Sequence, residues 1–268
     1  MEQLKQIPGQ NLFAKKRFTF IVVLVGLISL FWVAAHIASY SVIGGLLAPP
    51  RAIYWMINNL VPTADSWARM PTILNRLVET ALVSVAVTVC AAICALMFSL
   101  LGTKTLKVNA VIGRLVRMIA AIFRAIPEVV WAILFMFSFG QNILTGFFAL
   151  FFYTFGTMTR AFIETIDEVS GNCVEALQAT GAGPVQVVFQ GIVPSSITMV
   201  ISWVLYMIET NIRAATLIGL LTGTGIGALF NLYYTRLDYG SAALVVYTTA
   251  ILVIAIEMVS NQIRKVIL

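Results

Sequence analysis

Apolar residues fall into six long runs along this chain, separated by segments rich in polar residues, glycine and proline. A hydrocarbon core of about 30 Å needs roughly 20 apolar residues in a helix, and charges are sparse within each run. The pattern predicts an all-α, polytopic membrane protein with about six transmembrane helices. We expect these helices at residues 18–40, 77–101, 118–139, 143–159, 195–221 and 239–260.

Three connections between the runs have a distinct composition. Residues 41–71 hold four prolines and two tryptophans, which is typical of an external loop with a short interfacial helix. Residues 222–238 are glycine-rich and then aromatic, and we expect a second external loop there. Residues 160–194 carry four acidic residues, which make this longest internal loop too polar for lipid.

The basic residues set the predicted orientation. With the N-terminus inside, twelve of the 17 Lys and Arg residues fall in internal segments, and an excess of Lys and Arg marks the cytoplasmic side. The sequence therefore predicts that both termini are cytoplasmic (N-in, C-in). The basic residues left outside are Arg51, Arg69, Arg76, Arg213 and Arg236.

Composition agrees with a membrane location and excludes several functions. Of the 268 residues 60% are hydrophobic and only 10% charged, and the mean hydropathy is +0.96, far from that of soluble proteins. The net charge of +6 does not indicate nucleic-acid binding, because the basic residues mainly flank apolar runs. The first run follows Lys15, Lys16 and Arg17 and is too long for a signal-peptide core, so we expect a retained anchor.

The sequence does not predict catalytic activity for this chain. His36 is the single histidine, and the three cysteines have no metal-ligand spacing, so no metal site is predicted. No GxxxxGK[ST] motif is present, so the chain has no loop of this type to hold nucleotide phosphates. We expect a transporter subunit rather than an enzyme, with energy supplied by a partner.

Residues 175–194 read EALQATGAGPVQVVFQGIVP, which is unusual in so apolar a chain. A short helix can form over 170–180, GAGP at 181–184 breaks it, and a second short helix can run from Pro184 to Pro194. The segment predicts a helix, glycine turn and helix across the cytoplasmic face. It is either a rigid knob for a soluble partner or an ordinary amphipathic loop.

This segment resembles the cytoplasmic signature of permease subunits of binding-protein-dependent ABC importers. That signature begins Glu-Ala-Ala, has glycine three residues further on, and ends in a hydrophobic residue and proline thirteen residues after the glycine. Here Glu175-Ala176-Leu177 is followed by Gly181 and by Val193-Pro194. The third alanine is a leucine and the usual Leu-Pro is Val-Pro, which are mild departures.

The resemblance narrows to the phosphonate branch of these permeases. It is carried by FRAIPEVVWAILF at 123–135, EALQATGAGPVQVV at 175–188 and LYMIETNIRAATLIGLLTGTGIG at 205–227. It covers residues 72 to 268, whereas residues 1–71 match weakly. We therefore expect an N-terminal part at 1–71, with the cytoplasmic tail, the first helix and the external loop, and an importer core domain at 72–268.

The resemblance implies a type I ABC importer permease fold in the cytoplasmic membrane. Its implied partners are two ATPase subunits that bind ATP and Mg²⁺, a second permease copy or paralogue, an external substrate-binding protein and membrane lipid. The helix near 170–194 would be the coupling helix, with Glu175, Ala176, Gly181 and Pro194 shaping the ATPase contact. The cargo would be phosphonate or a related oxyanion, phosphite or phosphate, moved by alternating access.

Charges within the predicted spans need an explanation, because a charge at the centre of a membrane helix costs roughly 2.5–3.5 kcal/mol on insertion scales. Arg213, with Asn211 and Thr216 nearby, could line an oxyanion path, since guanidinium matches oxyanion oxygens. Alternatively these charges form ion pairs, because Glu209 and Arg213 are four residues apart on one helix face. The charges in question are Glu79, Arg124, Glu128, Glu209, Arg213 and Glu257.

Two backbone features add to this picture. Arg124 and Glu128 are also four residues apart, so they form a local pair or an inner gate, or the Arg124 side chain snorkels to the cytoplasmic surface. Pro127 between them predicts a kink that could act as a hinge. Gly225 belongs to a glycine cluster that ends the fifth span. We interpret this cluster as an external gate, a docking rim for the binding protein or an ordinary loop.

Three other functions stay open from the sequence. The closest is a permease of the same class for another small anion or an amino acid, since these share the cytoplasmic signature. A membrane-embedded enzyme would need a convergent catalytic set, and a passive channel would not need the cytoplasmic segment.

Overall fold

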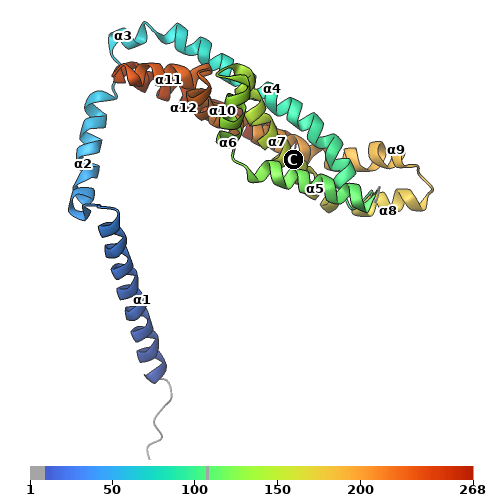
Figure 1. Cartoon of the computed structure of the whole chain (residues 1–268). Coiled ribbons are helices and arrows are strands. Elements are labelled where there is room, and N and C mark those ends of the chain that lie inside the picture. Colours follow the sequence, from blue (N-terminus) through green and yellow to red (C-terminus); the bar gives the residue numbers. More distant parts are fainter. Residues whose placement is uncertain (1–9, 107–108, 268) are drawn as a thin grey trace, which may run out of the picture. The chain divides into compact units, whose positions relative to one another are not determined.

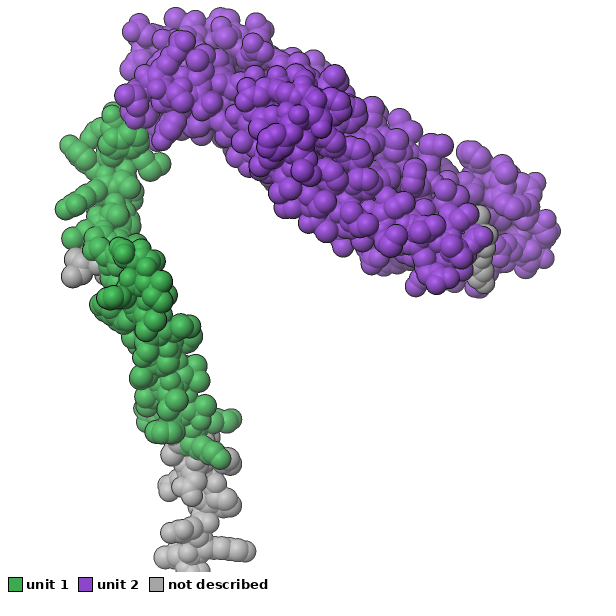
Figure 2. All heavy atoms as spheres, viewed as in Figure 1, with its two compact units in different colours: residues 1–59 green, residues 60–268 purple. Residues whose placement is uncertain are grey.

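The computed structural model describes residues 10–106 and 109–267, and the chain divides into two compact units, residues 1–59 and 60–268 (Figure 2). The first unit contains α1 (Gln10–Ile37) and α2 (Val42–Asn59). From Lys15 onward every side chain of α1 except Ala35 is exposed within the unit. An apolar helix with so much exposed surface requires lipid or another protein around it.

The second unit is built from helices, and its described residues include no β-strand. Figure 1 shows α8 and α9 at one end of this unit and α3 and α11 at the other. In chain order the helices are α3 (Ala64–Trp67), α4 (Met70–Gly102), α5 (Ala110–Ala125), α6 (Glu128–Phe139), α7 (Ile143–Val169), α8 (Gly171–Ala179), α9 (Pro184–Gln186), the π-helix η1 (Val187–Ile192), α10 (Val193–Thr222), α11 (Gly225–Thr235) and α12 (Tyr239–Ile267).

Helix α7 is the centre of this unit. It packs against α4, α5, α6 and α10, and 61% of its apolar window is buried, against 28% in α4, α10 and α12. The less buried helices keep apolar side chains on the outside, as expected of helices in contact with lipid. The all-α, polytopic prediction is confirmed.

Five helices of the described chain are long and apolar enough to cross a membrane, and the number is six if the bent pair of α5 and α6 counts as one span. The kink predicted at Pro127 is present, but it is a break with an 88° bend between the two helices. Proline lacks the backbone N–H that would continue α5, and it disfavours helical φ and ψ in the residue before it. The prediction of about six spans is therefore confirmed.

Two predicted loops contain more helix than expected. Helix α7 continues to Val169, ten residues beyond the predicted end of the span. Its 27 residues make it about 40 Å long, so it can project beyond the hydrocarbon core. Helix α11 (Gly225–Thr235) occupies most of the loop predicted at residues 222–238. Gly223 caps α10 with a left-handed backbone (φ 67°), which turns the chain back into α11.

Candidate functional site

Residues 171–192 form a helical hairpin, here named the cytoplasmic hairpin, in which α8 packs against η1. The hairpin has its own apolar core, which includes Val174, Val187 and Ile192 and continues into α7 through Ile166. Gly191 makes the approach close, because a β-carbon there would lie 2.8 Å from Leu177 Cδ1. The segment is therefore a packed knob and not a loose loop.

Gly181 forms the turn of the cytoplasmic hairpin and has a left-handed backbone, with φ +83°. Its N–H donates to the Gln178 carbonyl at 3.0 Å, and the Ala182 N–H donates to the Leu177 carbonyl at 3.1 Å. A β-carbon at Gly181 would meet no atom within 4 Å. The glycine is thus required by the backbone conformation and not by space within this chain.

The exposed surface of the cytoplasmic hairpin includes three of the predicted site residues, Glu175, Ala176 and Gly181. It also includes two apolar side chains that sequence reasoning missed, Val185 at 70% exposure and Phe189 at 68%. The spacing of Val185 and Phe189 in the sequence could have indicated this pair, since residues four apart share one face of a helix. The rest of this chain leaves both apolar side chains uncovered.

The sequence suggested that the second short helix ends at Pro194. In the structure Pro194 lies within a continuous helical path. Helices α9, η1 and α10 follow one another without a gap from Pro184 to Thr222. Proline cannot donate the ordinary helical bond to the residue four before it, and the wider π turn lies directly before Pro194. The π turn is a local device that accommodates the proline without breaking the helix.

Arg213 and Glu209 on α10 form the ion pair that their spacing predicts, with Nη2 and Oε1 3.0 Å apart. The Glu209 side chain is 10% exposed and that of Arg213 is 50% exposed. Arg213 and Thr216 line a groove of about 490 Å³ between α10, α11 and α12, whose other walls are mostly apolar. A guanidinium with its head in an apolar groove can attract an anion, but a buried ion pair is also a common structural element.

Asn211 lies away from this groove and joins three helices. It is buried, its amide Nδ2 donates to Thr88 Oγ1 of α4 at 2.8 Å, and its Oδ1 accepts from Thr154 Oγ1 of α7 at 3.1 Å. The Asn211 carbonyl also accepts from Ser84 Oγ at 3.3 Å. This network satisfies the buried amide and fixes α10 against α4 and α7.

Arg124 and Glu128 do not share a helical face, because the break at Pro127 separates them. Arg124 is exposed in the last turn of α5, and Glu128 is half-buried in the first turn of α6. The ion pairs found among the described residues do not include this one. The expected local pair is therefore wrong, and each charge instead lies at the helix end whose dipole favours it.

Glu79 lies nine residues after the start of α4 at Met70, and Gly225 is the first residue of α11. Glu79 Oε2 is 2.7 Å from Arg76 Nη1, one turn earlier on α4. Gly225 has φ +59° and packs against Thr80, whose hydroxyl accepts from the Ile226 N–H at 2.8 Å. Gly225 therefore fixes the start of α11 to α4.

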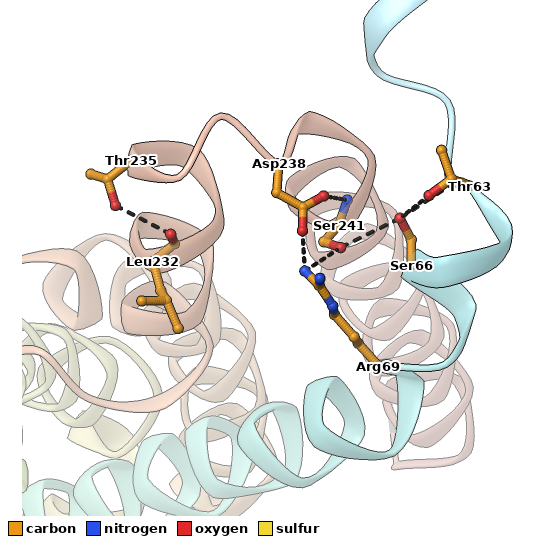
Figure 3. Close-up of polar contacts among 7 residues, drawn as sticks. All are labelled: Thr63, Ser66, Arg69, Leu232, Thr235, Asp238 and Ser241. Atoms are coloured by element: carbon orange, nitrogen blue, oxygen red, sulfur yellow. Dashed lines mark hydrogen bonds and ion pairs between the residues drawn. The ribbon is translucent and has the colours of Figure 1, made fainter.

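A polar cluster that was not predicted lies at the same end of the unit as α11 (Figure 3). Arg69 donates to Asp238, which precedes α12, and to Ser241 Oγ at 3.0 Å, and its guanidinium carbon lies 5.1 Å from the ring centre of Tyr233. Burial raises the pKa of the Asp238 carboxyl, but hydrogen bonds from Ser241 and Arg69 and the Arg69 charge outweigh it, so the pKa lies below its ordinary value.

The described residues contain no group of three or more His, Cys, Asp or Glu side chains that could hold a metal ion. The expectation that this chain carries no metal or cofactor stays a prediction.

Residues 88–267 match the sequence profile of the binding-protein-dependent transport system inner membrane component. The match covers two thirds of the chain and includes the cytoplasmic hairpin, α10 and all of α12. This chain belongs to that family. It is a multi-pass inner-membrane permease subunit of an ABC importer, a class that works with an ATPase and a substrate-binding protein.

Two curated relatives of this permease subunit are named for phosphorus oxyanions. HtxC of Stutzerimonas stutzeri, named as a permease of a phosphite transport system, is 26% identical over 254 residues, which cover 95% of this chain and 88% of HtxC. PhnE of Mycolicibacterium smegmatis, a phosphate-import permease protein, is 26% identical over 207 residues. That match covers 77% of this chain and 38% of PhnE, a much longer protein.

Solved structures show the same fold. A chain from the MetNI methionine ABC transporter in an inward-facing conformation has a TM-score of 0.61 at 20% identity, covering 74% of this permease subunit and 98% of that chain. A chain of an amino acid ABC transporter has a TM-score of 0.65 at 12% identity, covering 76% and 98%. The type I importer fold of this permease subunit is thereby established.

Proposed function

We propose that this permease subunit moves a phosphorus oxyanion, namely phosphonate, phosphite or phosphate, into the cytoplasm by alternating access. The observation that carries the proposal is the match to HtxC along almost the whole chain, together with the match to PhnE. The methionine and amino acid transporters share the fold at lower identity, so the fold does not decide the cargo.

In this proposal the energy comes from two cytoplasmic ATPase subunits, which bind ATP and Mg²⁺. The cytoplasmic hairpin docks on one ATPase, with Glu175, Ala176 and Gly181 at the contact and Val185 and Phe189 as its apolar anchor. The packed core of the hairpin supports this role, because a rigid knob transmits displacement better than a loose loop. A second copy of this chain, or a paralogue, completes the membrane pathway, and an external binding protein delivers the cargo.

Arg213 is the residue we assign to anion attraction along the pathway. An arginine has five N–H donors, and the pair with Glu209 uses Nη2, which leaves donors for oxyanion oxygens in the groove. Glu209 lowers the cost of holding this guanidinium within the membrane, and Thr216 lines the same groove. Arg124, Glu128, Glu79 and Gly225 stay candidates for gate positions at the two ends of the pathway.

The test is transport by the complete importer in proteoliposomes, assembled from this chain with its partner ATPase and binding protein. We expect ATP-dependent uptake of phosphite, phosphate or methylphosphonate, and none of methionine. Uptake of methionine without any of the three phosphorus compounds would overturn the proposed cargo. Failure of every ATPase preparation to bind the permease would overturn the coupling role.

A pair of variants separates the two interpretations of Arg213. Arg213→Gln alone leaves the Glu209 charge buried without its partner, which costs about 3–5 kcal/mol and can unfold the protein. Glu209→Gln with Arg213→Gln removes both charges and should restore folding. If Arg213 attracts the anion, the double variant assembles but transports poorly, whereas normal transport would assign the pair a structural role.

A further inference from the structure

Asp167 occupies an unfavourable position for an acidic residue. It lies in the last turn of α7, which ends at Val169, where the helix dipole places partial negative charge. Its neighbour Glu168 is exposed to solvent, whereas Asp167 is half-buried. A carboxylate at such a place requires compensating hydrogen bonds.

The compensation comes from the turn that connects α4 to α5. Asp167 Oδ1 accepts from the Lys104 N–H at 2.9 Å, from the Thr105 N–H at 3.2 Å and from Thr105 Oγ1 at 2.9 Å. Thr103 Oγ1 donates to the same oxygen. Hydrogen bonds to a carboxylate are about twice as strong as neutral ones, so this group fixes the turn firmly to α7.

The same turn is held from a second side by α5. Arg117 Nη1 donates to the Gly102 carbonyl at 2.8 Å, at the C-terminal end of α4 where a cation is favoured. A β-carbon on Gly102 would lie 2.5 Å from Ile163 Cδ1, so α4 also packs closely on α7 there. The ends of α4, α5 and α7 are therefore joined into one block.

The cytoplasmic hairpin begins directly beyond this block. Ser170 alone separates α7 from α8, and Val174 of α8 packs in the apolar cluster that contains Ile166 and touches Leu106. Asp167, Thr105 and Glu175 line one groove of about 310 Å³ at the base of α8. A displacement of α8 therefore acts on Asp167 within one helical turn.

We infer that Asp167 is a positioning residue through which movement of the cytoplasmic hairpin reaches α4 and α5. The inference rests on the proposed function, because the hairpin moves only if an ATPase displaces it. Without the carboxylate, the 103–105 turn loses its hydrogen bonds to the end of α7, and a displacement of α8 reaches α4 and α5 through packing alone. ATP would then be hydrolysed without the full rearrangement of the membrane helices.

The test is Asp167→Asn in the complete importer in proteoliposomes, with phosphite as the transported probe. The measured quantity is phosphite transported per ATP hydrolysed, which we expect to fall roughly 5-fold or more, within the range of coupling energies between sites. A purely structural role would lower the amount of complex and its melting temperature but leave this ratio unchanged. An unchanged ratio in assembled Asp167→Asn complex would overturn the inference.

Two further variants keep the test decisive. Thr103→Val with Thr105→Val removes both hydroxyl donors and keeps the carboxylate and its backbone donors, so it serves if Asp167→Asn does not assemble. It should lower the ratio by a smaller factor, because two of the four hydrogen bonds to the carboxylate remain, and a lower melting temperature with an unchanged ratio would indicate a purely structural role. Glu164→Gln is the matched control, since Glu164 is exposed on α7 and pairs with Arg160 at 2.6 Å on the same helix. Wild-type complex that fails to transport phosphite, phosphate or methylphosphonate would instead refute the proposed function.

Discussion

Substitution of Gly181 tests whether the tip of the cytoplasmic hairpin contacts the ATPase. The φ of +83° costs a non-glycine residue about 1–2 kcal/mol, and asparagine less than alanine or a branched residue. Because a β-carbon meets nothing within 4 Å, bulk adds no clash within this chain. The strain is small beside a total stability of about 5–15 kcal/mol, so Gly181→Asn, Gly181→Ala and Gly181→Phe should all insert and fold.

The assay compares ATPase stimulation by the permease with the amount of complex that forms. Strain alone disfavours the turn by a factor of roughly 5–30, whatever the size of the new side chain. We expect Gly181→Asn to retain most stimulation and Gly181→Phe to lose it, because the added ring enters the partner contact. Normal transport by Gly181→Phe would refute the docking of this tip. Gly223→Phe is the control, since Gly223 also has a left-handed backbone, with φ 67° and ψ 26°, and its β-carbon would make only ordinary contact with Gln141 Oε1 at 3.7 Å, but it lies at the C-terminal end of α10.

Three further predictions concern stability. Asn211→Leu removes the amide that links α10 to α4 and α7, and we expect a loss of about 0.6–1.7 kcal/mol in detergent unfolding; an unchanged midpoint would contradict the network. Because the pKa of folded Asp238 lies below its ordinary value of 3.8, its contribution is present above that value and is lost as the pH falls through the lowered pKa. As the pH decreases, the free energy of unfolding should fall by less than about 1 kcal/mol on account of Asp238, and Asp238→Asn should abolish this fall. Identical pH profiles of the two proteins would contradict the prediction. Gly227→Ala places a β-carbon 2.6 Å from the Leu220 backbone nitrogen and should lower the melting temperature, whereas Gly171→Ala, with open space around it, should not.

The sequence predicted local features well, because hydrophobic runs, proline and glycine act within one or two helical turns. The runs located α1, α4, α7, α10 and α12, and Pro127 located the break between α5 and α6. The pair between Glu209 and Arg213 followed from helical spacing alone. The domain boundary predicted at 71/72, the external gate at Gly225 and the coupling residues stay predictions.

Long-range polar contacts could not be predicted from this pattern. Asn211 and Thr88 are 123 residues apart, and Arg69 and Asp238 are 169 apart, so no local periodicity relates them. Asp167 was one of several acidic residues that marked an internal loop, and its partners in the 103–105 turn depend on how α4 packs on α7. The same dependence explains the failed pairing of Arg124 and Glu128, since spacing of four residues has meaning only within one continuous helix.

Two physical connections leave the cytoplasmic hairpin, and together they locate where the proposed rearrangement can occur. One is the unbroken path through η1 into α10, where Arg213 lies 20 residues, or about 30 Å, beyond Val193. The other is Asp167, which joins the hairpin to α4 and α5. Asn211 fixes α10 to α4 and α7, so these three helices cannot slide independently without breaking buried hydrogen bonds. Trp131 of α6 bridges the 88° break, because its Nε1 donates to the Phe123 carbonyl of α5 at 3.3 Å, and α6 also packs on α7. In the proposed mechanism α5 and α6 therefore move together with α7 when the hairpin moves.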